Sequence, residues 1–413
     1  RGFCLSRGLG DVYKRQDDFH PYVYKTTDYG AHWSAMSDGL PDDQYVFVVR
    51  QDPRDPRVLL AGTRSTMYVS LDGGGKWRPL TLNLPGVQVR DIAIDARQGD
   101  VAVATHGRAF WILDNLTVLE QLANNVSGAP LLFAPETAWL SYAYGSSPFA
   151  SPGSGQNPAY GAGVFFNLPA DYAGKTALRL AFLDANGHTV RSFDLHLRNK
   201  KEKKPTPEQI ANMDQVARMA NGLHQLTGVD AGMNLFQWDM RYAPATEAHG
   251  VRAFGTDDFG DTVDGPTIVP GKYTVVLSYG GKRLQQPFRV ALDPRFYPAP
   301  GALAARLALA MRIHNTLDAL NRAVNAGEAA RLRLSGDKRA QLDAALGNLV
   351  QLNTHSSEGD LLHESKMRDH LAFLMNSLDL AYQAPTPAQY AIYDELRAQA
   401  AAEIARLRAA MQA

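Results

Sequence analysis

The pattern of hydrophobic and polar positions divides the chain into three regions. From residue 17 to 125, short apolar or alternating runs are separated by turns rich in Asp, Gly and Pro, which predicts antiparallel β-strands. Strand-like runs continue from 130 to 297 with longer loops between them. From 298 onward, apolar residues recur every three or four positions, which predicts helices. In the first region the predicted strands are 22–25, 45–50, 58–62, 67–69, 89–94, 101–105 and 109–113.

One motif occurs twice in the first region, with 44 residues between its copies. Both copies fit Ser/Thr-x-Asp-x-Gly-x-x-Trp, formed by Thr26, Asp28, Gly30 and Trp33 and then by Ser70, Asp72, Gly74 and Trp77. The hydroxyl and the carboxylate are expected to accept hydrogen bonds from backbone N–H groups. The glycine is expected to supply a positive φ, and the tryptophan is expected to cap the core between strands. Four predicted strands per 44-residue period are typical of a propeller blade.

These motifs are Asp boxes, and the segment that follows them strengthens a resemblance. Residues 104–114, Ala-Thr-His-Gly-Arg-Ala-Phe-Trp-Ile-Leu-Asp, resemble the last propeller blade of the large bacterial sortilin-like, BNR (Asp-box) repeat glycosyl hydrolases. The resemblance extends from residue 17 to the end of the chain. It implies a secreted or periplasmic protein, with glycoside hydrolysis as its activity and the catalytic groups on blades upstream of this segment.

No catalytic residue can be assigned from the sequence itself. In sialidases, which share the Asp box, the box lies on the blade periphery, so Asp28 and Asp72 are expected to be structural. His106 and Arg108 are candidate pocket residues, because an arginine binds a carboxylate through two hydrogen bonds. Arg108 is equally able to brace the fold. Since no facing carboxylate pair is recognisable, the alternative function is non-catalytic binding of a glycan or peptide by a propeller with docking modules.

The second region, 130–297, predicts an Ig-like sandwich. Strands are expected at 164–168, 178–183, 189–197, 234–241, 271–277 and 286–292, with an Asn-Gly turn after the second of them. Their spacing resembles FlgD-like Ig modules, and Trp238 and Tyr273 are expected in the core. A helical insertion is predicted at 200–233, because Thr206-Pro207-Glu208-Gln209 has the form of a helix start.

One acidic loop in this region is a weak candidate for calcium. It contains Asp257, Asp258, Asp261 and Asp264, and Ca²⁺ takes six to eight oxygen ligands. The spacing does not fit an EF-hand, and the alternative is a solvated loop. We therefore expect no cofactor and no other metal.

The third region, 298–413, predicts a small bundle of antiparallel helices. The first is expected to end near residue 325, the second to contain Leu342, Leu346 and Leu349, and the third to cover 371–382. Thr386 and Gln389 form a capping box at the start of the last helix. The expected fold is thus multi-domain, mainly β and then α: a remnant of an Asp-box β-propeller (17–125), an Ig-like, FlgD-like β-sandwich (130–297) and an α-helical domain (298–413).

The composition of the chain excludes some classes of partner, but it says little about the reaction. The 413 residues contain 42 Lys+Arg and 42 Asp+Glu, and a nucleic-acid binder needs a basic excess. No apolar run is long enough for a membrane span. Residues 6–16 match the translation of a transposase-type sequencing adapter, so 1–16, with the only cysteine, Cys4, are expected to be a non-native leader. The oligomeric state is left open.

Overall fold

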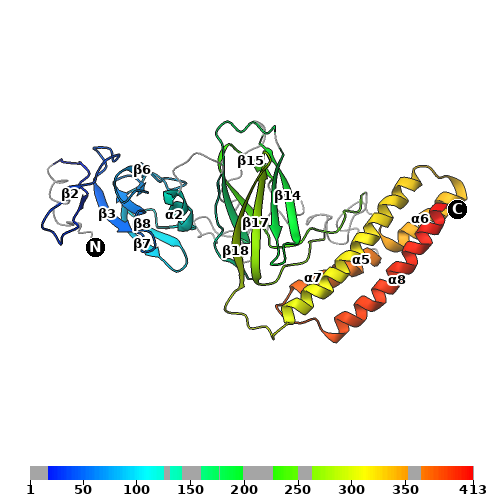
Figure 1. Ribbon diagram of the computed structural model, residues 1–413. Coiled ribbons are helices and arrows are strands. Elements are labelled where there is room, and N and C mark those ends of the chain that lie inside the picture. The colour runs from blue at the N-terminus through cyan, green and yellow to red at the C-terminus, as the bar shows by residue number, and fades with distance from the viewer. Residues whose placement is uncertain are drawn as a thin grey trace. The chain divides into compact units, whose positions relative to one another are not determined.

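The computed structural model describes residues 17–124, 131–141, 160–175, 177–198, 227–249, 263–351 and 364–412. The chain divides into two compact units, Arg1–Ala129 and Pro130–Ala413. The first is mainly β, and the second consists of β-sheets followed by a helical region (Figure 1). The protein is therefore multi-domain, β first and α last, as the sequence predicts at this coarse level.

The described residues of the first unit form three antiparallel sheets in succession. A hairpin of β1 (Tyr24–Lys25) and β2 (Ser34–Ala35) comes first. A four-stranded sheet follows, in the order β3 (Val46–Gln51), β4 (Leu59–Thr63), β5 (Met67–Ser70) and β6 (Trp77–Pro79). The third sheet has the order β7 (Val89–Asp95), β8 (Asp100–Thr105) and β9 (Phe110–Leu113), and helix α2 (Leu116–Asn124) comes after it.

The four-stranded sheet is buried on both faces. Val49, Leu59 and Tyr68 belong to one hydrophobic cluster with Val23, from the hairpin region. Leu60 and Val69, which alternate with those residues along their strands, belong to a second cluster with residues of the three-stranded sheet and α2. The alternation of a strand sends successive side chains to opposite faces. The three sheets are consequently stacked as layers, with β4 buried along its whole length.

The second unit begins with two sheets that share one hydrophobic core. The smaller has the order β10 (Leu131–Leu132), β12 (Ala162–Leu168) and β16 (Gly232–Trp238). The larger has the order β11 (Ala138–Leu140), β18 (Lys282–Leu292), β17 (Gly271–Tyr279), β13 (Leu178–Leu183), β14 (Thr189–Leu197) and β15 (Gly228–Val229). Phe182 of the larger sheet stacks on Trp238 of the smaller, with 4.1 Å between ring centroids. Trp238 and Tyr273 are buried, as predicted.

In the described residues, four helices follow the sheets. They are α5 (Ala302–Arg331), α6 (Gly336–Leu349), α7 (Met367–Asp379) and α8 (Pro387–Gln412), and all four contribute to one apolar core. The predicted capping box starts α8: the Gln389 side chain accepts the Thr386 N–H at 2.9 Å, and the Thr386 hydroxyl accepts the Gln389 N–H at 3.2 Å. The first helix is longer than predicted, since it continues past residue 325 to Arg331.

An extended segment of the sheet region is bound along α5. The N–H and hydroxyl of Thr246 both donate to Asp318, at 3.0 and 2.6 Å, and the Asn321 amide donates to the Thr246 carbonyl at 2.7 Å. Asn325 exchanges two further hydrogen bonds with residues 247 and 249. Ala248 is buried in the helical core. Residues 246–249, which we call the strap, thus pack as part of the helical region although the chain places them between β16 and β17.

A buried arginine joins the same two regions. The Arg241 guanidinium, after β16, lies 2.6 Å from the Asp379 carboxylate at the end of α7. Asp379 also accepts the Thr267 hydroxyl at 3.1 Å. Burial acts to lower the pKa of Arg241, but the carboxylates of Asp379 and Asp264 outweigh it and raise the pKa. Arg241 is therefore held charged, and removing the Asp379 carboxylate would weaken the compensation of this buried charge.

Candidate functional site

The first Asp box forms the turn between β1 and β2. The Thr26 hydroxyl oxygen accepts the Gly30 N–H at 2.8 Å, and the Asp28 carboxylate accepts the His32 N–H at 2.9 Å. The Thr26 hydroxyl donates to Asp28 at 2.9 Å, which locks the two side chains together. Gly30 has a φ of 97°, which a residue with a Cβ adopts only under strain. The carboxylate is thus used to close its own turn.

The second Asp box repeats these contacts between β5 and β6. The Ser70 hydroxyl oxygen accepts the Gly74 N–H at 2.8 Å, and the Asp72 carboxylate accepts the Lys76 N–H at 3.0 Å. Gly74 also has a φ of 97°. Burial acts to raise the pKa of Asp72, but hydrogen bonds from Ser70 and from backbone N–H groups outweigh it and lower the pKa. The hydrogen bonds expected of the motif are therefore present in both copies.

The two tryptophans differ. Trp77 is 2 % exposed, and its indole N–H donates to the Met36 carbonyl at 2.8 Å, so it ties the second box to the chain that follows β2. Trp33 is 45 % exposed, and its indole N–H donates within its own turn, to the Gly30 carbonyl at 3.1 Å. The prediction that the tryptophan caps a core is confirmed for Trp77 and wrong for Trp33, because the two-residue strands of the first hairpin provide too little apolar surface to cover the ring.

His106 and Arg108 lie on the exposed turn between β8 and β9. The turn is held by its backbone: the His106 N–H donates to the Gln88 carbonyl at 2.9 Å, and the Trp111 indole donates to the Arg108 carbonyl at 2.8 Å. Within the described ranges, the Arg108 guanidinium forms no ion pair. The structure brings the two residues together on one turn, and their assignment to a pocket stays a prediction.

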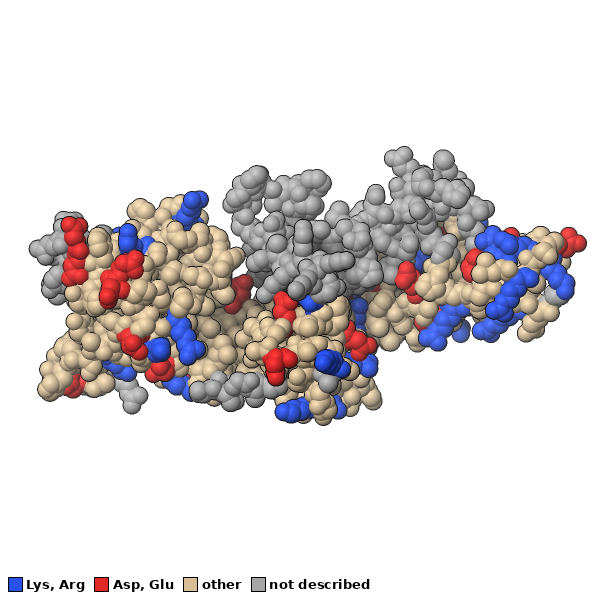
Figure 2. All heavy atoms as spheres, turned by 90° about the horizontal axis from the view of Figure 1, so that it is seen from above, with Lys and Arg blue, Asp and Glu red and all other residues tan. Residues whose placement is uncertain are grey.

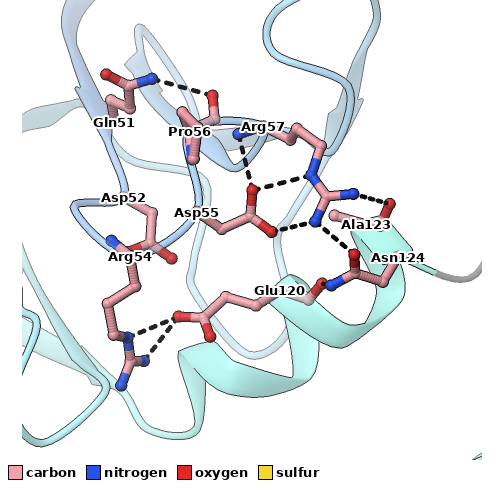
Figure 3. Close-up of polar contacts among 9 residues, drawn as sticks. All are labelled: Gln51, Asp52, Arg54, Asp55, Pro56, Arg57, Glu120, Ala123 and Asn124. Carbon is pink, nitrogen blue, oxygen red and sulfur yellow. Dashed lines mark hydrogen bonds and ion pairs between the residues drawn. The ribbon is translucent and has the colours of Figure 1, made fainter.

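A polar cluster that the sequence did not predict joins the β3–β4 turn to α2 (Figure 3). Asp55 accepts two hydrogen bonds from the Arg57 guanidinium, from Nε at 2.9 Å and from Nη2 at 2.5 Å. Arg57 also donates to the Asn124 side chain at 2.6 Å and to the Ala123 carbonyl at 3.3 Å. The Arg57 hydrogen bonds lower the pKa of Asp55. This part of the cluster fixes the C-terminal end of α2 to the turn.

Two carboxyl groups meet in the second half of the cluster. Asp52 is 2 % exposed and accepts the Arg54 N–H at 2.8 Å through Oδ1, and Glu120 accepts the Arg54 guanidinium at 2.8 and 2.7 Å. Burial raises the pKa of Glu120, and a hydrogen bond to Asp52 raises it further against the opposing charge of Arg54. Glu120 is therefore the carboxyl of this cluster whose protonated form its surroundings favour.

Sequence reasoning missed this pair for a simple reason. The run Asp52-Pro53-Arg54-Asp55-Pro56 predicts a turn and nothing more, while Glu120 lies in a helix that was not predicted. The pairing depends on α2 packing under the turn, which no local pattern encodes. Chemically, the cluster offers one carboxyl with a raised pKa, that of Glu120, which is bound by the Arg54 guanidinium and lies near the buried Asp52.

Two kinds of feature, groups of metal ligands and membrane-spanning helices, are absent from the described residues. No group of three or more His, Cys, Asp or Glu able to hold a metal ion occurs within those ranges. Of the calcium candidates, Asp257, Asp258 and Asp261 lie outside the described residues, and Asp264 lies 3.6 Å from the Arg241 guanidinium. None of the helices that the structure describes is long and apolar enough to cross a bilayer. Basic and acidic side chains lie near one another on the face seen in Figure 2.

Comparison with known proteins adds no identification, since the chain matches no protein-family profile and no curated protein.

Proposed function

We propose that the chain is part of a secreted or periplasmic Asp-box β-propeller protein that binds a glycan or a peptide. The observation that carries this proposal is the repetition of one hydrogen-bonded turn, 44 residues apart, in consecutive stacked antiparallel sheets. Stacked sheets with a turn motif in each are typical of propeller blades. The sortilin-like, BNR-repeat resemblance supplies the ligand class and the location.

Binding is favoured over hydrolysis by what the carboxylates of the first unit do. Asp28 and Asp72 close their turns, and Asp55 is bound to Arg57. Groups that are fully engaged in structural hydrogen bonds are not available as an acid or a base at a sugar. A binding propeller needs only an exposed surface, and the turn that carries His106 and Arg108 provides one.

The second unit supports a role in docking. We propose that its two sheets form an Ig-like, FlgD-like sandwich, since they enclose one core that includes the stacked pair of Phe182 and Trp238. The buried ion pair of Arg191 and Asp239, at 2.9 Å, joins the two sheets, and the Arg241 contact with α7 connects them to the helices. Such a unit presents a rigid surface for attachment, which is what a docking module requires.

Glycoside hydrolysis is the second candidate, and one observation favours it. The Asp52–Glu120 pair places a carboxyl with a raised pKa beside a second carboxyl, which is the electrostatic arrangement that a glycosidase needs for its general acid. Glu120 is, however, bound by Arg54, and Asp52 is buried. This candidate therefore requires the cluster to open when substrate binds.

A paired assay on the full chain tests both candidates. We expect retention of specific glycans or peptides on an array with no release of reducing sugar. Arg108→Ala should weaken that retention, and Glu120→Gln, which keeps the shape of the side chain, should leave it unchanged. Hydrolysis that is lost in Glu120→Gln would establish the second candidate instead. The proposal would be refuted if the chain neither bound nor hydrolysed any ligand on the arrays.

A further inference from the structure

The charged residues of the first unit are divided unevenly between the two ends of its larger sheets. At one end the β3–β4 turn, the β7–β8 turn and α2 come together. The carboxyl groups of this end belong to Asp52, Asp55, Asp95, Asp100, Asp114 and Glu120. Its arginines bind those carboxyls, since Arg54 lies 2.7 Å from Glu120 and Arg57 lies 2.5 Å from Asp55. At this end, arginine is part of the structure.

The opposite end, which we call the arginine end, is where β4 ends and β7 begins. Two backbone hydrogen bonds join the segments there: the Val87 N–H donates to the Ser65 carbonyl and the His106 N–H donates to the Gln88 carbonyl, both at 2.9 Å. Three exposed arginines lie within two residues of these contacts, on three different segments: Arg64, Arg90 and Arg108.

The arginines of this end have little carboxylate to bind within the chain. Arg64 lies 3.7 Å from Asp43, whose side chain is 64 % exposed, and such exposed pairs contribute little. Within the part of the chain that the structure describes, Arg90 and Arg108 form no ion pair. Unlike Arg54 and Arg57, they neutralise no carboxylate of their own unit, so their guanidinium groups are available to an anion from outside.

Aromatic rings hold two of these arginines in place. The Arg90 guanidinium lies over the Phe47 ring, 4.2 Å from its centroid, and that of Arg64 lies over Phe19 at 5.3 Å. Tyr45 joins the two rings, with its centroid 5.9 Å from that of Phe19 and 5.0 Å from that of Phe47. A guanidinium that stacks on a ring still directs N–H groups outward from its edge, where two of them fit a carboxylate.

The aromatic surface continues onto the first hairpin. The ring of His20, which follows Phe19 in the chain, lies 5.0 Å from Tyr22 between centroids, and the Tyr24 ring is nearly parallel to that of Tyr22 at 6.5 Å. Tyr22 is 40 % exposed and Tyr24 is 44 % exposed. Aromatic faces are electron-rich, and the C–H groups of sugar rings pack against such faces.

Exposed aromatic rings beside unpaired arginines fit a ligand that has sugar rings and carboxylates together. We propose that the first unit binds an anionic polysaccharide, whose sugars carry carboxylates, through Arg64, Arg90 and Arg108. This inference rests on the proposed function, whose binding turn carries Arg108, and it specifies the ligand of that site. An extended polymer also suits three arginines that are spread over three segments. An acidic peptide has the charge but lacks the sugar rings that suit the exposed tyrosines.

Titration calorimetry of the full chain tests the ligand class. The probes are polygalacturonate and alginate, whose sugars each carry a carboxylate, and methyl-esterified polygalacturonate, which keeps the sugar chain but lacks the charge. We expect binding of at least one polyuronate, weakened by added salt. The methyl ester, and poly-L-glutamate as the acidic peptide, should bind at least about tenfold more weakly. These measurements use the wild-type chain and do not depend on how a variant folds.

Substitutions of the exposed arginines test the site. Arg90→Gln and Arg108→Gln should each raise the dissociation constant of the polyuronate at least about fivefold. Arg97→Gln is the matched control, because Arg97 is also exposed but lies in the β7–β8 turn at the other end of the same sheet. It should bind as the wild type does.

The outcomes separate this inference from the proposed function. Binding of neutral glycans or of peptides without binding of either polyuronate would overturn the inference and leave the proposed function standing. Equal affinity for the methyl ester, equal affinity for poly-L-glutamate, or no difference between Arg97→Gln and the other two variants would also overturn it. A chain that binds none of these ligands would contradict both.

Discussion

The two Asp-box turns have the same hydrogen bonds, yet only one of them holds its tryptophan in a core. Each turn is closed by a hydroxyl, a carboxylate and a glycine from within eight residues, and the two hydrogen bonds from the glycine N–H and from the N–H four residues after the aspartate agree in length to about 0.1 Å. Trp77 is buried and Trp33 is not. The motif therefore encodes a turn, and burial of the tryptophan is a property of the sheets around that turn.

Replacement of the tryptophans should give the largest difference between the boxes. Trp77→Ala removes a fully buried ring and its hydrogen bond to Met36, and should destabilise the first unit by about 3–5 kcal/mol. Trp33→Ala removes a half-exposed ring and should cost less than about 1 kcal/mol. Urea denaturation, followed by hydrogen exchange of amides in β4 and β5, measures both. Equal losses would show that Trp33 is buried in solution.

The glycines should give a smaller difference of the same sign. Both have a φ of 97°, so an alanine at either place is strained by about 1–2 kcal/mol. A Cβ on Gly30 would lie no closer than 3.7 Å to another group. A Cβ on Gly74 would meet the end of Met36 and lie 3.2 Å from the Leu59 side chain. Gly74→Ala should therefore cost about 1 kcal/mol more than Gly30→Ala, measured by the same denaturation, and the reverse order would contradict the packing.

The carboxylates should give the smallest effect, visible only at acidic pH. Hydrogen bonds from the backbone N–H and the ring of His32 lower the pKa of Asp28, and the pKa of Asp72 is lowered as well. A lowered pKa in the folded state adds stability above the ordinary carboxyl pKa, and this stability is lost as pH falls through the folded value. Below about pH 4 the wild type should lose stability.

The matched variants isolate that effect. Asp28→Asn and Asp72→Asn should each have a flatter dependence of melting temperature on pH in this acidic range, with the larger change for Asp72→Asn because its turn holds Trp77. Melting curves between about pH 3 and 6, which span the ordinary carboxyl pKa, provide the measurement. Unchanged slopes in both variants would mean that the turns do not depend on the ionised carboxylates.

Local sequence patterns predicted most of the longer strands and helices, whereas the remaining elements depend on long-range packing. Strands such as β4 and β8 lie within one residue of their predicted bounds, because alternation and turn residues mark them in the sequence. Helix α2 and the short strands β10, β11 and β15 were not predicted. They are brief or weakly patterned, and their positions depend on the partners they pack against.

The contacts of the candidate site also fall into a local group, which the sequence predicted, and a long-range group, which it did not. The hydrogen bonds of the Asp boxes connect residues at most four positions apart, so sequence spacing was enough to predict them. Arg54 and Glu120 are 66 residues apart, and their ion pair exists only because α2 lies under the β3–β4 turn. Spacing carries no information about such a contact.

The strap holds the sheets and the helices of the second unit together through a second connection. Residues 246–249 are bonded to Asp318, Asn321 and Asn325 of α5, and Ala248 is part of the helical core. The backbone between β18 and α5 is therefore not the only link between sheets and helices. A protease cut in that connection would leave two fragments that stay associated until the helical core itself unfolds, and the same connection is a natural place to open new chain termini.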